Sequence, residues 1–269
     1  MSLLGQLLDY ANHLVVCRRG TRALSRRLEA LPTTLVGAKT GAPLFVRGHL
    51  KPHELLVTPL SGSRVVGYRV VIEVPSRYWV NRRVLVDFCR LAPSTLEPSD
   101  GGDAVELAGT SIQILVEKPC IEGRRAGGTA EEPKGFPKEV VAVLADQAQI
   151  RADARDTKPY RWGEYHLHGD EEVWIEGALA DASVPKTDVT ASDASVPESG
   201  LTAPGAEADD ASPTGTNEKP GMSHLTGIGE RPLWLTAVPR DALFAALVDP
   251  DEHWLRALPR HPLSDRTTD

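Results

Sequence analysis

Cysteine is scarce in this 269-residue chain, and its three copies, Cys17, Cys89 and Cys120, lie far apart. The chain has no Cys-x-x-Cys pair, which excludes a zinc ribbon and a RING-type zinc module, because both need closely spaced thiolates. An odd number of widely separated cysteines favours a reduced chain with free thiols over a disulfide framework. This cysteine usage predicts a cytoplasmic protein.

Long apolar runs, targeting signals and catalytic signatures are also missing. No stretch of about 18 apolar residues occurs, so no membrane-spanning helix is expected. The first residues lack the basic region and the cleavage site of a secretory signal peptide. No G-x-S-x-G, P-loop or G-x-G-x-x-G element stands between a strand and a helix. The chain is therefore interpreted as non-catalytic, with no catalytic residue, cofactor or metal ligand predicted.

The chain carries no overall excess of positive charge. The net charge is −7, and residues 181–220 alone hold eight acidic side chains and two lysines. The remainder is close to neutral, so it lacks the broad basic surface typical of nucleic-acid-binding proteins. Because residues 181–230 are rich in Ala, Ser, Thr, Pro, Gly and acids, we predict a disordered acidic linker or insertion there.

The N-terminal residues 1–31 have the pattern of an amphipathic helix. Apolar side chains recur at helical spacing and lie on one face, Leu4, Leu7, Leu8 and Leu14 among them. A run of arginines follows, which includes Arg18, Arg19, Arg22 and Arg26. These apolar and basic residues are candidates for docking on a protein partner or on an anionic membrane surface. Packing on the chain's own body or on a second copy, which would give a homo-oligomer, is the alternative.

The rest of the chain reads mainly as β-structure. Period-two alternation or apolar runs predict strands at 44–50, 55–58, 65–74, 80–91, 160–167, 173–177 and 232–236. A loop is expected at 93–102, a hairpin around Ala108-Gly109-Thr110, a mobile segment at 123–135, and helices at 137–149 and 239–248. Residues 32–180 form the predicted β-rich domain, which a strand and helix in 231–258 close.

Two segments of the chain carry distinctive motifs. The first has Gly48, the turn Leu56-Val57-Thr58-Pro59-Leu60-Ser61-Gly62, Tyr68 and Ile72-Glu73. The second runs from Trp162 to Gly177 and contains Glu164 and the turn Leu167-His168-Gly169-Asp170. Together these segments resemble the GIDE domain, also called the BAM ("beside a membrane") domain. The resemblance implies a membrane-adjacent adaptor related to E3 ubiquitin ligases. The RING and the transmembrane helices of the eukaryotic relatives are not in the sequence, and Val65-Val66-Gly67 stands where relatives carry a Cys.

The L-H-G-D turn followed by an alternating strand also suits an OB-like antiparallel barrel or sandwich. The fold class predicted is therefore mainly β, with the N-terminal helix, one or two short helices and the disordered insertion. Glu73 and Glu164 are then interpreted as structural residues that cap or pair inside the barrel.

A candidate binding face combines aromatic and histidine side chains from two strand regions. It comprises Tyr78, Trp79, Trp162, Glu164, His166 and His168. His166 and His168 are two residues apart on a strand and share a face with Glu164, which is metal-ligand geometry in principle. The aromatic rings also suit stacking on single-stranded nucleic acid.

The leading function expected is a non-catalytic binding or adaptor domain in a protein complex or at the inner face of a membrane. Two alternatives stay open: a single-stranded nucleic-acid-binding barrel, and a component of a ubiquitin-ligase-like transfer system.

Overall fold

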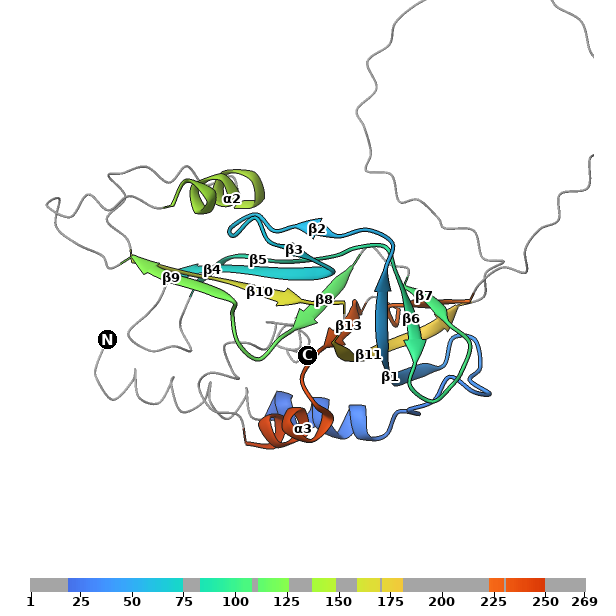
Figure 1. Cartoon of the computed structure of the whole chain (residues 1–269). Helices are drawn as coiled ribbons and strands as arrows, with labels where there is room; N and C mark the ends of the chain where they lie inside the picture. Colours follow the sequence, from blue (N-terminus) through green and yellow to red (C-terminus); the bar gives the residue numbers. More distant parts are fainter. Residues whose placement is uncertain are drawn as a thin grey trace, which may run out of the picture.

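The computed structural model describes residues 19–74, 83–107, 111–125, 137–148, 159–169, 171–180, 223–229 and 231–249 (Figure 1). The structure is mainly β, with a closed barrel, a second sheet and few helices, so the predicted fold class is confirmed. Among the described residues, no helix combines the length and the apolar character needed to span a membrane.

The barrel is formed by β1 (Pro43–Pro52), β6 (Ser94–Pro98), β7 (Val105–Leu107), β12 (His224–Thr226) and β11 (Glu172–Ala180). These strands pair in that order, and β11 pairs back onto β1 to close the ring. Only β7 and β12 run parallel among these pairs; the others are antiparallel. A closed five-stranded ring with this order is a Greek-key barrel of the OB type.

Gly48 lets one strand serve both neighbours at the point of closure. Residues 43–49 of β1 pair with β11, and residues 48–52 pair with β6, so β1 changes partner at Gly48. A Cβ at this position would lie 2.4 Å from the carbonyl oxygen of Glu97 and 2.7 Å from Leu96 Cδ1. Only glycine allows β6 to approach β1 this closely.

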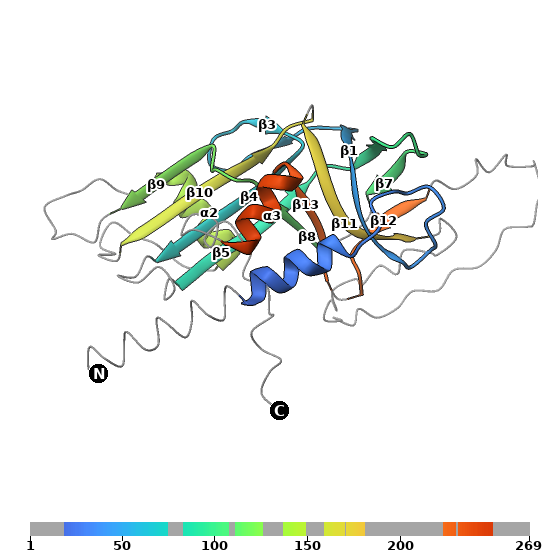
Figure 2. The same cartoon turned by 90° about the horizontal axis from the view of Figure 1, so that it is seen from below.

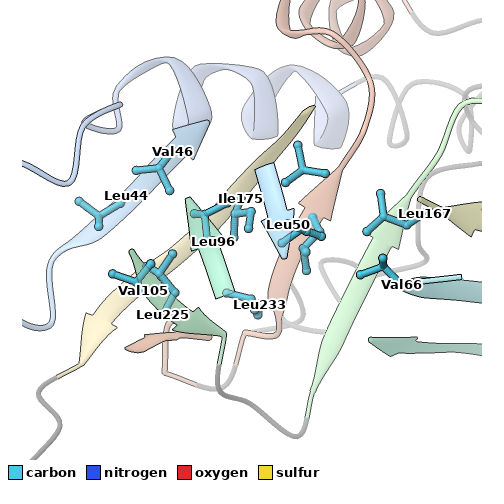
Figure 3. Packing of buried hydrophobic residues seen from close by; sticks show 12 residues of the cluster. Leu44, Val46, Leu50, Val66, Leu96, Val105, Leu167, Ile175, Leu225 and Leu233 are labelled. Carbon is cyan, nitrogen blue, oxygen red and sulfur yellow. The ribbon is translucent and has the colours of Figure 1, made fainter. Parts of the chain in front are cut away.

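The barrel interior is filled by aliphatic side chains from alternate strand positions. Leu44, Val46 and Leu50 point inward from β1, and Val173 and Ile175 point inward from β11. Figure 3 shows side chains from these and neighbouring strands pointing toward one another. The side chains at every second position of these strands thus fill the closed interior of the barrel.

Two further strands extend the barrel sheet on the outer edge of β11. β13 (Leu233–Thr236) pairs antiparallel with β11, and β8 (Ile112–Leu115) pairs parallel with β13. β12 pairs antiparallel with β11, so the segment that separates them in the sequence joins two neighbouring strands of one sheet.

A four-stranded antiparallel sheet lies beside the barrel, in the order β5 (Arg83–Leu91), β4 (Gly67–Val74), β10 (Tyr160–Leu167) and β9 (Ile121–Arg125). The helix α2 (Lys138–Ala148) packs Val140, Val143 and Leu144 against one face of this sheet. The short pair β2 (Leu56–Val57) and β3 (Arg64–Val65) lies over the same face, where Leu56, Leu60 and Val65 join the cluster (Figure 1).

Residues 19–29 form a helix that lies beside α3 (Arg240–Val248) against the outside of the barrel (Figure 2). Leu28 of this helix packs with Phe45 of β1 and with Leu243 and Leu247 of α3. Arg27 adds an ion pair of 2.7 Å to Glu176 of β11. In residues 19–29 the apolar face therefore packs on the chain's own body.

Several local predictions from sequence are wrong. β6 occupies part of the loop expected at 93–102, because Ser94 and Leu96 are buried toward the barrel although the segment is rich in turn residues. The strands on either side of the expected hairpin do not pair with each other, since β7 pairs with β6 and β12 whereas β8 pairs with β13. Strands also lie in the expected mobile segment and in the expected linker, namely β9 through Arg125 and β12 at 224–226.

Candidate functional site

The centre of the candidate site is Glu164, a carboxylate on β10 with no solvent exposure. One oxygen, Oε2, accepts a hydrogen bond from the backbone N–H of Leu60 at 2.7 Å. The other, Oε1, accepts from the hydroxyl of Ser61 at 2.7 Å and contacts His166 Nε2 at 2.8 Å. Glu164 thus ties the turn between β2 and β3 to β10, which is the pairing role expected for it from sequence.

Burial raises the pKa of Glu164, but the hydrogen bonds from His166, Ser61, Leu60 and Thr58 outweigh it and lower this pKa below its ordinary value. Glu164 is therefore ionised at neutral pH. An ionised carboxylate can only accept hydrogen bonds, so Nε2 of His166 must carry the proton in this contact. The neutral tautomer of His166 then has its free lone pair on Nδ1.

His166 also lies beside two residues that are exposed, His168 and Cys120. The imidazole rings of His166 and His168 meet edge to face, with 5.9 Å between their centroids. One ligand atom from each of Cys120, His166 and His168 lies within 4.8 Å of the other two. The backbone N–H of Cys120 donates to the carbonyl of Glu164 at 2.8 Å, which fixes this residue against β10.

Sequence reasoning places Glu164, His166 and His168 on one face of a strand. The structure brings Glu164 and His166 into direct contact and sets His168 beside His166. Cys120 was not among the predicted site residues, because it is 46 positions from His166 and no local pattern links them. The expectation that Glu73 and Glu164 lie inside the barrel is wrong, since both are buried on the four-stranded sheet.

The aromatic part of the predicted face is only partly described. Tyr78 and Trp79 lie outside the described residues. Trp162 is half-buried against the α2 cluster, and a Cβ on Gly123 would lie only 2.3 Å from its ring. The ring of Trp162 therefore packs closely over the backbone of β9, and its contact with the α2 cluster is that of a core side chain.

The outer face of the barrel bears on the nucleic-acid alternative, because OB barrels bind oligonucleotides over their second and third strands. Those strands are β6 and β7 here. Glu97 and Glu106 on this face lie within ion-pair distance of Lys51, at 3.5 Å, and His224, at 3.6 Å. The two carboxylates disfavour phosphate binding on this face.

Some of the predicted docking residues lie before residue 19, where the described structure begins, and the others lie at or after it. Leu4, Leu7, Leu8, Leu14 and Arg18 lie outside the described residues. Arg19, Arg22 and Arg26 are exposed on the solvent side of the helix at 19–29. We call these three side chains the arginine stripe. Its spacing of three and four residues aligns the guanidinium groups along one helix face.

No protein-family model, curated protein or solved structure was found to match the chain.

Proposed function

We propose that this protein is a non-catalytic binding domain that docks an acidic protein surface through the arginine stripe. The observation that supports the proposal is the orientation of the helix at 19–29. Its apolar side, with Leu24 and Leu28, packs on the barrel, whereas Arg19, Arg22 and Arg26 face solvent. The helix is thus held rigidly by its body and presents three cations in a row.

A protein partner fits this arrangement better than a membrane. Each arginine near an anionic lipid surface contributes about 1 kcal/mol, so three give about 3 kcal/mol, which is weaker than millimolar binding. Stronger lipid binding needs an apolar face inserted among acyl chains. Within the described part of the helix that face is already packed on Phe45, Leu243 and Leu247. Carboxylates on a folded partner can instead form bidentate hydrogen bonds with guanidinium groups.

The resemblance to the GIDE domain is consistent with an adaptor, and it is the only basis for two finer expectations. These are action beside a membrane and a part in a ubiquitin-transfer system. The OB-type barrel keeps single-stranded nucleic-acid binding as a competing function, although the pairing of Glu97 and Glu106 disfavours it.

Charge reversal tests the proposal and leaves the packed side of the helix intact. Removing the whole N-terminal helix would also remove Leu28 from the core, whereas Arg19→Glu, Arg22→Glu and Arg26→Glu change exposed side chains. Of these three, Arg22 also donates a hydrogen bond of 3.3 Å to the carbonyl of Val248 at the end of α3, so folding of the variant is checked by its urea midpoint. The matched control reverses three other exposed cations, Lys39→Glu, Lys118→Glu and Lys138→Glu, for the same change in net charge.

The partner is first isolated on the tagged full-length chain and then titrated, as a purified protein, against the parent and both triple variants. We expect the arginine variant to bind at least about tenfold more weakly, since each lost charge-assisted hydrogen bond costs about 1.5–3 kcal/mol. The lysine variant should bind as the parent does. Equal affinity of both variants would refute the docking surface. If the chain binds only phosphatidylserine vesicles, and the arginine variant loses that binding, the docking partner is a membrane and not a protein. If both variants bind an oligonucleotide in a salt-sensitive way, the nucleic-acid alternative is favoured.

A further inference from the structure

We propose that Cys120, His166 and His168 form a zinc site, in which Glu164 orients His166. The inference is independent of the arginine stripe. It rests on ligand atoms from a loop and a strand that lie within 4.8 Å of one another. A thiolate and two imidazoles are the ligand types that Zn²⁺ prefers.

The distances are close to those of an assembled site. Bonds of about 2.0–2.1 Å to nitrogen and about 2.3 Å to sulfur place the ligand atoms of a tetrahedral zinc site about 3.3–3.8 Å apart. The ligand atoms here lie within 4.8 Å of one another, so they must approach by up to about 1.5 Å to bind one ion. Cys120 and His168 are exposed, so both can make this adjustment by side-chain rotation. His166 is buried and defines the fixed point of the site.

The contact between Glu164 and His166 is the strongest structural argument. Metal-binding histidines commonly donate their second ring N–H to a carboxylate, which fixes the tautomer and makes the other nitrogen a better ligand. Glu164 has this position, with its Oε1 2.8 Å from Nε2 of His166. Because Glu164 occupies Nε2, Nδ1 is the His166 nitrogen that remains for zinc. Glu164 is itself held by Leu60 and Ser61, so the imidazole cannot turn freely.

Three ligands determine the chemical character of the site. Binding replaces the proton of the Cys120 thiol by the metal, so one proton is released for each zinc ion bound. A tetrahedral ion with three protein ligands retains a fourth position, which water or a donor group from another molecule would take. Zinc imposes no geometry of its own, which suits ligands that come from β10, from the residue directly after it and from the segment before β9.

The test uses the full-length chain and Co²⁺ as a spectroscopic substitute for Zn²⁺. We expect one Co²⁺ per chain, a thiolate-to-cobalt charge-transfer band, and loss of that band when Zn²⁺ displaces the cobalt. Cys120→Ser should abolish the band, and His168→Gln should weaken Co²⁺ binding at least about tenfold. Both residues are exposed, so neither substitution threatens folding.

The matched controls are Cys89→Ser, at the other described free thiol, and His49→Gln, at an exposed histidine of β1. Both should bind Co²⁺ as the parent does. Glu164→Gln should weaken binding by about 10–100-fold while the charge-transfer band at saturation persists, because this residue positions a ligand and does not bind the metal. Zn²⁺ should also protect Cys120 from alkylation by iodoacetamide. The proposal is overturned if no thiolate band forms, or if Cys120→Ser and His168→Gln bind Co²⁺ with the affinity of the parent.

Discussion

Asp87→Ala should destabilise the protein strongly, because it leaves a buried cation without its carboxylate. Arg69 of β4 is 2% exposed, and its Nε and Nη2 donate to the two oxygens of Asp87 on β5 at 2.7 and 2.9 Å. The guanidinium also lies 5.7 Å from the ring centroid of Tyr165 on the opposite neighbouring strand. Arg69 therefore sits in the middle of the four-stranded sheet, where a lone charge is poorly hydrated.

The expected magnitude follows from this burial. Removal of one partner from a buried ion pair costs about 3–5 kcal/mol. The side chain of Asp87 is 21% exposed, so water can reach the vacated position and the cost should lie near 3 kcal/mol. In urea unfolding followed by tryptophan fluorescence, this is a shift of the midpoint by about 1–1.5 M, for a slope of about 2–3 kcal/mol per M.

Two comparisons separate this explanation from a general effect of mutation. Glu122→Ala removes the partner of Arg161 in the same sheet, but that pair is 35% and 60% exposed and should contribute less than about 1 kcal/mol. In the double variant Arg69→Met with Asp87→Ala, the buried charge is also gone, so much of the lost stability should return. The reasoning is refuted if Asp87→Ala is no more destabilising than Glu122→Ala, or if the double variant is less stable than Asp87→Ala.

Three further predictions concern the barrel closure, the buried carboxylate and the thiols. Gly48→Ala should destabilise by about 1–3 kcal/mol in urea unfolding, since its Cβ would overlap the carbonyl of Glu97, and an unchanged midpoint would contradict the close approach of β1 and β6. Folding lowers the pKa of Glu164, so the ionised carboxylate stabilises the folded state fully above the unfolded pKa, near 4.5. This stabilisation is lost as the pH falls through the folded pKa. The acid unfolding curve of Glu164→Gln should lack this pH-dependent loss of stability. Burial raises the pKa of Cys89 to about 11. Iodoacetamide at pH 8 should therefore label exposed Cys120 in the native, metal-free protein and Cys89 only after unfolding, as peptide mass mapping can show.

Local patterns in the sequence were sufficient for many of the elements. Alternation in residues 65–74 and the apolar run at 173–177 predict strands, and these form as β4 and β11. The apolar spacing of residues 137–149 and 239–248 predicts helices with a period of 3.6 residues, and these form as α2 and α3. An element that packs on any apolar surface needs its apolar residues at these periods. The pattern therefore predicts the element without knowledge of the segment on which it packs.

Only the tertiary structure shows which strands pair with one another. The turn residues near 108–110 indicate a change of direction, but closure of the barrel pairs β7 with β6 and β12 and leaves β8 to pair with β13. Likewise, the i, i+2 spacing of His166 and His168 predicts a shared face, whereas the arrival of Cys120 depends on how β9 pairs with β10. Strand pairing between distant segments is set by the summed burial of the whole core, and no local stretch of sequence contains that sum.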